Sequence, residues 1–207
     1  MIKYIVNEVA PLGANCYTVY DTESKNCLII DLGGDFSFIL NQTSRLGLKV
    51  KGVVLTHGHF DHSAGAVNCK EMGIPVYVSK DDYGMLQDMT NMSEYFGFGK
   101  LSFCADFILP YGETEIGGIK INVLKTSGHT EGSVCLLIDG KLYSGDTIFY
   151  NSYGRCDLPT GSFSKLKKSI TEVVFSLPDH TEILAGHGEK TTVGYERKYN
   201  PINEDNY

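Results

Sequence analysis

Three histidines and an aspartate lie within the six residues from His57 to His62, in the order His57, His59, Asp61 and His62. The whole chain has six histidines, so half of them fall in this one stretch. Imidazole nitrogens and carboxylate oxygens are the groups that bind zinc, iron and manganese in proteins. Four such groups held this close repel and desolvate one another unless a cation lies between them. The stretch therefore predicts a metal site rather than a polar turn that happens to be rich in histidine.

Three further candidate ligands stand in similar surroundings later in the chain. They are His129 in Thr-Ser-Gly-His-Thr, Asp146 in Tyr-Ser-Gly-Asp-Thr and His187 in Ala-Gly-His-Gly. Each follows an expected strand, and each directly follows a glycine, which lets backbones crowd together because it has no Cβ. Together with the first stretch they make five histidines and two aspartates, enough for two metals that share one carboxylate. His180 lacks this context and is expected at the surface.

Short strands and helices alternate along the chain and would place these ligands at strand ends. The expected strands are Ile2–Glu8, Cys16–Tyr20, Cys27–Asp31, Val50–Leu55, Pro75–Val78, Ile119–Leu124, Val134–Ile138, Lys141–Tyr143 and Glu182–Ala185. The expected helices are Phe36–Leu46, Ser63–Met72, Lys80–Met89 and Ser162–Ser176. The Asp139-Gly140 pair predicts a hairpin turn. The alternation indicates an α/β protein with sheets inside and helices outside, and the length of 207 residues fits one domain over residues 1–207.

The segment Thr90–Ala105 is rich in aromatic residues, methionine and glycine but has no clean period. Two interpretations stay open for it. It can be an irregular connection in the core, or a lid over a site.

Composition and charge narrow the class of protein. Apolar residues make up 42% of the chain and charged residues 21%, as in ordinary globular proteins. The formal charge of −7 argues against nucleic acid as a partner, because phosphate binding needs a basic face. We expect the Lys165, Lys167 and Lys168 group to be a solvated helix face rather than an RNA-binding patch.

Compartment and partners follow from what the sequence lacks. No signal peptide and no apolar run of transmembrane length are visible, and the six cysteines are scattered without a Cys-x-x-Cys pair. We therefore expect a cytoplasmic protein with reduced thiols, a small-molecule substrate and no membrane partner. The oligomeric state stays open.

The pattern His-x-His-x-Asp-His, followed by Gly-His, Gly-Asp and Gly-His, resembles that of the metallo-β-lactamase superfamily. The resemblance covers nearly the whole chain and implies a four-layer αβ/βα sandwich with the metals at one edge. It also implies that one metal is bound by His57, His59 and His129. The second would be bound by Asp61, His62 and His187, with Asp146 bridging the two.

Two dications about 3.5–4 Å apart can hold one hydroxide at neutral pH and polarise a carbonyl or phosphoryl oxygen. Hydrolysis with that hydroxide as nucleophile is the expected chemistry. Asp61 would be the catalytic side chain that orients the water and receives a proton. Thr130 and Thr147 would either support the ligands or cap backbone groups. The expected metals are two divalent ions, zinc first, with iron or manganese as alternatives.

Among the branches of the superfamily, antibiotic-degrading lactamases commonly have Cys where Asp146 stands, and flavodiiron proteins have Glu where His59 stands. The runs 145–161 and 191–201 resemble small bacterial relatives of glyoxalase II, the hydroxyacylglutathione hydrolases. That resemblance implies thioester hydrolysis and a substrate contact by Arg155, for which an ion pair with Asp157 is the alternative. Full-length members add a C-terminal helical domain that grips glutathione, whereas 20 residues follow His187 here, so glutathione itself is not predicted.

Two other functions stay open. One is an oxygenase similar to persulfide dioxygenases, in which His57, His129 and Asp146 would hold a single iron. The other is a metal-binding module without catalytic activity.

Overall fold

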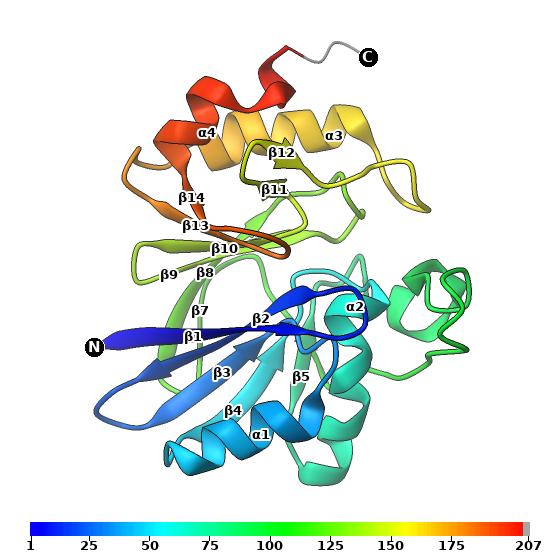
Figure 1. The fold of residues 1–207 in the computed structure, drawn as a ribbon, viewed down its shortest axis with the longest axis vertical. Helices are drawn as coiled ribbons and strands as arrows, with labels where there is room; N and C mark the ends of the chain where they lie inside the picture. Colours follow the sequence, from blue (N-terminus) through cyan, green and yellow to red (C-terminus); the bar gives the residue numbers. More distant parts are fainter. Residues whose placement is uncertain (205–207) are drawn as a thin grey trace.

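The structure is a computed structural model that describes residues 1–204. Two six-stranded sheets stack face to face, and helices cover their outer faces (Figure 1). The first sheet has the order β1-β2-β3-β4-β5-β6, and the second has the order β14-β13-β10-β9-β8-β7. Each sheet is therefore built from one continuous half of the chain.

The first sheet begins as an antiparallel meander and continues with parallel strands. Its strands are β1 (Ile2–Val9), β2 (Ala14–Asp21), β3 (Asn26–Ile30), β4 (Lys49–Val54), β5 (Val76–Val78) and β6 (Phe107–Ile108). Parallel neighbours need crossover connections. These are α1 (Phe36–Arg45) between β3 and β4, and α2 (Phe60–Ser63) with the 3₁₀ helix Ala64–Met72 between β4 and β5.

In the second sheet β7 to β10 are antiparallel, and β13 joins β10 in parallel. Its strands are β7 (Gly112–Ile116), β8 (Ile119–Lys125), β9 (Val134–Ile138), β10 (Lys141–Gly145), β13 (Glu182–Ala185) and β14 (Thr191–Thr192). Strands β11 (Ile148–Phe149) and β12 (Ser152–Tyr153) form a separate small hairpin. The outer helices are α3 (Phe163–Lys168), continued by the π-helix Ser169–Val173 and the 3₁₀ helix Val174–Ser176, and α4 (Val193–Tyr199), followed by the 3₁₀ helix Pro201–Asn203.

Three apolar cores lie between the four layers. The central core joins the inner faces of the two sheets, with Leu28 and Val54 from the first packed near Ile121 and Leu136 from the second. A second core lies between the first sheet and its helices, and a third lies between the second sheet and α3 with α4. This arrangement confirms the predicted αβ/βα sandwich.

Three of the expected helices differ in the structure. Ser162–Ser176 is helical as expected, but it is α only over Phe163–Lys168 and continues as a π-helix and a 3₁₀ helix. Ser63–Met72 is mainly 3₁₀ rather than α: α2 ends at Ser63, and at the start of the 3₁₀ helix the N–H of Gly65 donates to Gly33 O at 3.2 Å, outside the helix. The helix expected over Lys80–Met89 was wrong. Only the 3₁₀ turns Met85–Gln87 and Met89–Asn91 form there, and Asp82 uses its side chain for long-range contacts described below.

The segment Thr90–Ala105 forms a lobe that projects beside α2 (Figure 1). It contains little regular structure, yet it is closed by internal hydrogen bonds such as Asn91 Nδ2 to Leu101 O at 2.9 Å.

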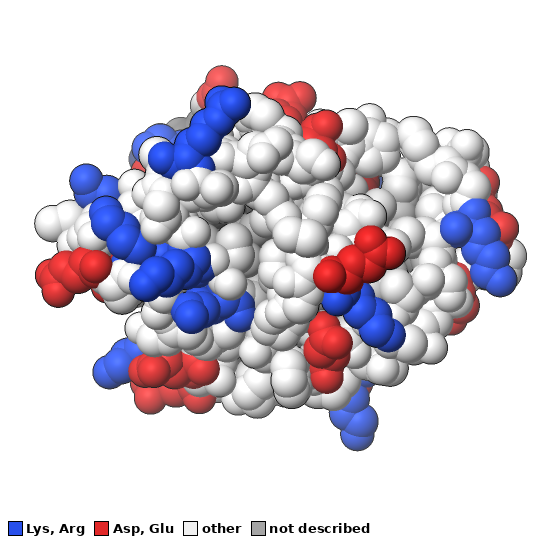
Figure 2. Space-filling view, turned by 90° about the horizontal axis from the view of Figure 1, so that it is seen from below, with Lys and Arg blue, Asp and Glu red and all other residues white. Residues whose placement is uncertain are grey.

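Four cysteines are buried, and all six are free thiols. The face in Figure 2 shows Lys and Arg gathered toward one end, with Asp and Glu beside and among them. Within residues 1–204, no helix is long and apolar enough to cross a membrane.

Candidate metal centre

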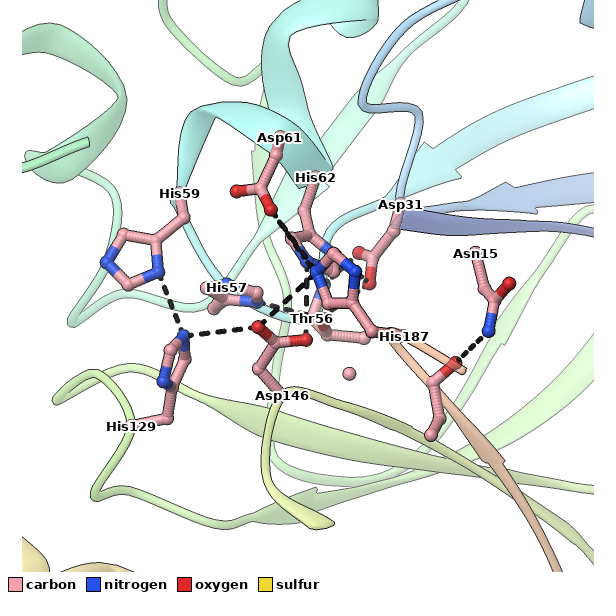
Figure 3. Close-up of polar contacts among 12 residues, drawn as sticks. Asn15, Asp31, Thr56, His57, His59, Asp61, His62, His129, Asp146 and His187 are labelled. Carbon is pink, nitrogen blue, oxygen red and sulfur yellow. Dashed lines mark hydrogen bonds and ion pairs between the residues drawn. The ribbon is translucent and has the colours of Figure 1, made fainter. Parts of the chain in front are cut away.

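All seven predicted side chains meet where strand ends from both halves of the chain come together, and they point toward one another (Figure 3). The first half contributes its residues from the loop after β4 and from α2. The second half contributes one residue after each of β8, β10 and β13. The seven side chains are those of His57, His59, Asp61, His62, His129, Asp146 and His187.

One cluster consists of His57, His59 and His129, each of which offers a nitrogen within 4.8 Å of the others. His59 Nδ1 and His129 Nε2 face each other at 2.9 Å. The buried Nε2 of His57 has no hydrogen-bond partner among the described residues. Two ring nitrogens this close and an unpartnered third are unfavourable unless a proton or a cation lies between them. This cluster therefore fits a metal ion.

A second cluster consists of Asp61, His62 and His187. His187 Nε2 lies 3.3 Å from Asp61 Oδ2 and 3.2 Å from His62 Nε2. His62 Nε2 lies 3.6 Å from Asp61 Oδ2. Two nitrogens and one carboxylate oxygen are a ligand set that divalent zinc, iron or manganese accepts.

Asp146 lies between the two clusters. Its Oδ2 is 3.6 Å from His129 Nε2 in the first cluster and 3.8 Å from His187 Nε2 in the second, and its Oδ1 is 3.3 Å from His62 Nε2. Its Oδ1 has no hydrogen-bond partner among residues 1–204. A carboxylate with one oxygen facing both clusters has the position that a bridging ligand needs.

Hydrogen bonds behind the histidines set which ring nitrogen faces the centre. His129 Nδ1 lies 2.7 Å from the backbone O of Arg155, and His62 Nδ1 lies 3.0 Å from Asp31 Oδ2. Because a carbonyl and a carboxylate only accept, each Nδ1 carries the proton, and each Nε2 presents its lone pair to the centre. Both rings are thus oriented for metal binding.

Asp31 was not among the predicted site residues. Besides His62 it accepts from the backbone N of Thr56 at 2.8 Å and from Thr56 Oγ1 at 2.7 Å, so it also holds the start of the histidine loop. A signal for it was present in the sequence. Asp31 follows a strand and precedes Gly33 and Gly34, much as the later ligands follow strands beside glycines.

Asp82 is a second residue that the sequence did not reveal. Its fully buried carboxylate accepts from Gly58 N at 2.9 Å, Gly132 N at 2.8 Å and Thr130 Oγ1 at 2.7 Å. Gly58 separates His57 from His59, and Thr130 follows His129. One carboxylate therefore ties together the two loops that carry the first cluster, and Thr130 acts through it. Thr147 contacts Thr126 instead, at 3.1 Å between their hydroxyl oxygens.

Burial and neighbouring charges shift the pKa values of histidines in the two clusters in opposite directions. Burial and the adjacent imidazoles hold the pKa of His57 well below its usual value and lower the pKa of His59 to about 3. Burial opposes the charged form of His62, yet the carboxylates of Asp146 and Asp61 raise its pKa well above the usual value. Burial would raise the pKa of Asp146, but His62 and the other imidazoles hold it well below its usual value. His57 and His59 are thus neutral and ready to donate lone pairs.

Glycine permits two of the close approaches at this centre. A Cβ on Gly186 would lie 2.2 Å from Asp146 Oδ1, and one on Gly154 would lie 1.8 Å from the backbone O of Asp146. The glycine before His187 therefore lets this loop touch the Asp146 carboxylate, as the sequence pattern led us to expect.

A cavity of about 450 Å³ opens over the centre. It is lined by Leu12, His59, Phe60, Asp61, Met92, Phe96, His129, Asp146, Phe149, Arg155, Leu158 and His187. Arg155 lies at its exposed rim, where Nε and Nη2 each donate to Asp157 at 2.8 Å.

A larger hollow of about 560 Å³ over β7, β8 and the β9–β10 turn contains none of the seven side chains. His180 is exposed, as expected, and belongs to none of the groups of candidate metal ligands found in residues 1–204.

Comparison with known proteins gives a consistent result. A family described as "Metallo-beta-lactamase superfamily" matches residues 9–187. Hydroxyacylglutathione hydrolase GloC of Haemophilus influenzae is 32% identical, covering 94% of this chain and 96% of its own. Probable metallo-hydrolase YqgX of Bacillus subtilis is 35% identical, covering 94% of each chain.

Two solved structures have similar folds and comparable sequence identity. BLEG-1 B3 metallo-beta-lactamase superposes with a TM-score of 0.90 at 32% identity, covering 98% of this chain and 99% of its own. TTHA1623 in a di-iron-bound form has a TM-score of 0.85 at 30% identity, covering 96% of this chain and 99% of its own.

Proposed function

Because this chain belongs to the metallo-β-lactamase superfamily and has the ligand set of a metal-dependent hydrolase, we propose that it hydrolyses thioesters with two divalent metal ions. The proposal of two metals is supported by the position of Asp146, whose carboxylate faces both clusters. A centre for one metal would need only one group of three ligands, whereas Asp146 lies between two such groups. Zinc is the proposed metal, and iron is the first alternative because TTHA1623 is described with two irons.

Metals bound here would supply a water of lowered pKa and would polarise the substrate carbonyl. The residues of the chain do the remaining work. Asp31 and the Arg155 carbonyl hold His62 and His129 in the orientation that presents Nε2 to the centre. Asp61, almost buried and lining the cavity, orients the attacking water and takes its proton. Water adds to the thioester carbonyl, the C–S bond breaks, and an acid and a thiol leave.

The thioester substrate rests on the similarity to the hydroxyacylglutathione hydrolase of Haemophilus influenzae and on Arg155. The guanidinium uses two of its five N–H donors on Asp157, which leaves three for an anionic group of a substrate at the cavity rim. We propose that Arg155 anchors such a group on the thiol carrier. The proposed setting is the cytoplasm, where the six free thiols would stay reduced.

The test is a substrate panel assayed with purified, metal-analysed protein. It contains thioesters of several thiols, a chromogenic cephalosporin because BLEG-1 is described as a metallo-β-lactamase, and glutathione persulfide with oxygen uptake as readout. Thioester cleavage that needs metal, at two ions per chain, is the expected result. Asp146→Ala should lose both metals and activity by orders of magnitude while keeping its circular dichroism spectrum.

Other outcomes would overturn the proposal. Turnover of the cephalosporin alone would make the protein a lactamase. A single tightly bound iron with oxygen uptake would favour the oxygenase built on His57, His129 and Asp146, and binding of metal without any turnover would favour a non-catalytic module.

A further inference from the structure

The cavity over the metal centre is apolar wherever it is not lined by candidate metal ligands. Across the part of the chain that the structure describes, its other lining side chains are Leu12, Phe60, Met92, Phe96, Phe149 and Leu158, with Arg155 as the one charged exception. The charge of Arg155 is matched by Asp157 at its exposed edge. A substrate group deep in this cavity would therefore meet hydrocarbon and aromatic surface.

One wall of the cavity contains Phe60 and Phe96, and Phe98 packs behind them against Phe60. Phe60 stands between His59 and Asp61 and is 2% exposed. Its ring lies 5.8 Å from that of Phe96 at 31° and 5.1 Å from that of Phe98 at 30°. These tilted ring contacts thus join the histidine loop directly to the lobe formed by residues 90–105. Because Phe96 is still 39% exposed, its ring has surface left for a further partner.

The lobe holds this wall in place through buried polar side chains. Ser93 N donates to Asn91 Oδ1 at 3.0 Å, and Leu101 N donates to Ser93 Oγ at 3.1 Å. Phe96 N donates to Met92 O at 3.1 Å, and Phe98 N donates to Ser93 O at 2.9 Å. Met92, only 5% exposed, completes the wall beside Phe96. The segment Thr90–Ala105, which has no period in its sequence, therefore contributes Met92 and Phe96 to the lining of the cavity.

Small polar acyl groups do not suit such a wall. A hydroxyl placed against Phe60, Phe96 and Met92 would give up its water without gaining a hydrogen bond, which is unfavourable. A phenyl ring or an alkyl chain would instead bury apolar surface there and stack on the exposed face of Phe96. A cavity of about 450 Å³ has room for such a group together with the thioester.

On the basis of the proposed thioester hydrolysis, we infer that the wall of Phe60, Met92 and Phe96 receives the acyl group, and that the substrates are thioesters of aromatic or bulky apolar acids rather than of small hydroxy acids. The thiol carrier then extends toward the rim, where Arg155 lies. The lobe is in this view the element that determines specificity, and the metal centre carries out the same chemistry on every acyl group.

The experiment uses one neutral thiol, N-acetylcysteamine, esterified with lactoyl, acetyl, hexanoyl and benzoyl groups. We expect kcat/KM of the metal-loaded protein to be at least about tenfold higher for benzoyl than for lactoyl. Phe96→Ala should lower kcat/KM for the benzoyl ester about tenfold or more and change kcat/KM for the lactoyl ester by less than about threefold. Phe96→Leu, which keeps an apolar side chain, should retain most of the kcat/KM for the benzoyl ester. Binding of S-benzyl-N-acetylcysteamine, which is not hydrolysed, should weaken in parallel in a calorimetric titration.

Phe38→Ala is the matched control. Phe38 is 56% exposed on α1, outside the cavity lining, so all four esters should react as with the unchanged protein. Lactoyl hydrolysis as fast as benzoyl hydrolysis, or equal losses on both esters in Phe96→Ala, would overturn the inference and leave thioester hydrolysis standing. If none of the esters, nor any thioester of another thiol, is cleaved, the proposed function itself fails.

Discussion

Asp82 shows how a single buried carboxylate connects two ligand-bearing loops. In Asp82→Asn the side chain keeps one acceptor oxygen and gains an NH₂ group, which would face the N–H of Gly58 or Gly132. Leaving a buried donor unsatisfied costs about 1–3 kcal/mol. We therefore expect lower stability in chemical denaturation and weaker metal binding by the cluster of His57, His59 and His129 in a zinc titration.

Asp81→Asn is the matched control for this change. Asp81 is the neighbouring residue, but it lies at the surface, where it accepts from Lys125 at 2.7 Å and Tyr111 at 3.0 Å. Surface ion pairs contribute about 0–1 kcal/mol, so both measurements should change little. An Asp82→Asn protein that behaves like Asp81→Asn would show that Asp82 does not position the loops.

Arg155 can be tested without disturbing His129. Arg155→Ala removes the guanidinium but keeps the backbone carbonyl that accepts from His129. Losing a charge-assisted contact should raise KM for thioesters of anionic thiols by about tenfold to a hundredfold, with kcat much less affected. Thioesters of neutral thiols should be almost indifferent, and Asp157→Asn, which frees the guanidinium, should lower KM for the anionic ones. Equal losses on both kinds of substrate would assign Arg155 a structural role only.

At the scale of the elements, the loops after β10 and β13 pack so closely that only glycine fits between them. In Gly186→Ala the new Cβ would lie 2.2 Å from Asp146 Oδ1 and 2.8 Å from His62 Cε1, so the Asp146 carboxylate must move. A displacement of this order in a catalytic group costs about a hundredfold in rate, and we expect that loss together with weaker metal binding in both clusters.

Gly84→Ala provides the comparison for that variant. Gly84 has helical backbone angles, and a Cβ there meets nothing within 4 Å. Activity and metal content should be unchanged. A Gly186→Ala protein with full activity would mean that the contact between these two loops is not needed for the centre.

The strands that precede ligands could be predicted for different reasons. β4 and β13 end in apolar residues, β8 alternates buried apolar residues with more exposed ones, and β10 follows the Asp139-Gly140 turn. The two-residue strands β6, β11, β12 and β14 carry no period, and they form only because longer elements bring their backbones together. The helix α4 was missed although Thr192 caps it by accepting from Tyr195 N at 3.3 Å. The role of Asp82 could not be predicted, since two of its partners lie 48 and 50 residues away. The seven candidate ligands were brought together as expected, while their assignment to particular metals stays a prediction.

At the scale of the whole molecule, the two halves of the chain share the metal centre. The first half supplies His57, His59, Asp61 and His62, and the second supplies the remaining three residues. Asn15 of β2 also reaches across, donating from Nδ2 to the carbonyls of Ala185 at 3.0 Å and Gly188 at 2.9 Å. A metal held by residues of both halves would therefore connect the halves as well as supply chemistry.

Acid should release the two metals in a fixed order. The pKa values of His62 and His187 are raised by the nearby carboxylates despite burial, so a metal must displace protons there already near neutral pH. Burial lowers the pKa of His57 and His59, so protons compete with a metal at these two residues only at much lower pH. As pH falls from 8 to 5, we expect the cluster of Asp61, His62 and His187 to lose its metal first.

Variants with one intact cluster each allow the measurement. His187→Ala keeps the first cluster, and His59→Ala keeps the second. Dialysis at stepwise lower pH, followed by elemental analysis, should give a lower midpoint pH for His187→Ala than for His59→Ala. The reverse order would contradict the electrostatic difference between the clusters.

The division of the centre between the halves also has a consequence for biosynthesis. Ribosomes make the chain from its N-terminus, and early segments begin to fold while later ones are still being made. The strands of the first sheet, residues 2–108, are complete before any strand of the second sheet is translated. The histidine loop is therefore made while both His129 and His187 are still missing. Metal loading of both clusters would follow the translation of His187, so the nascent chain passes through a stage in which four of its seven candidate ligands are present and neither cluster is complete.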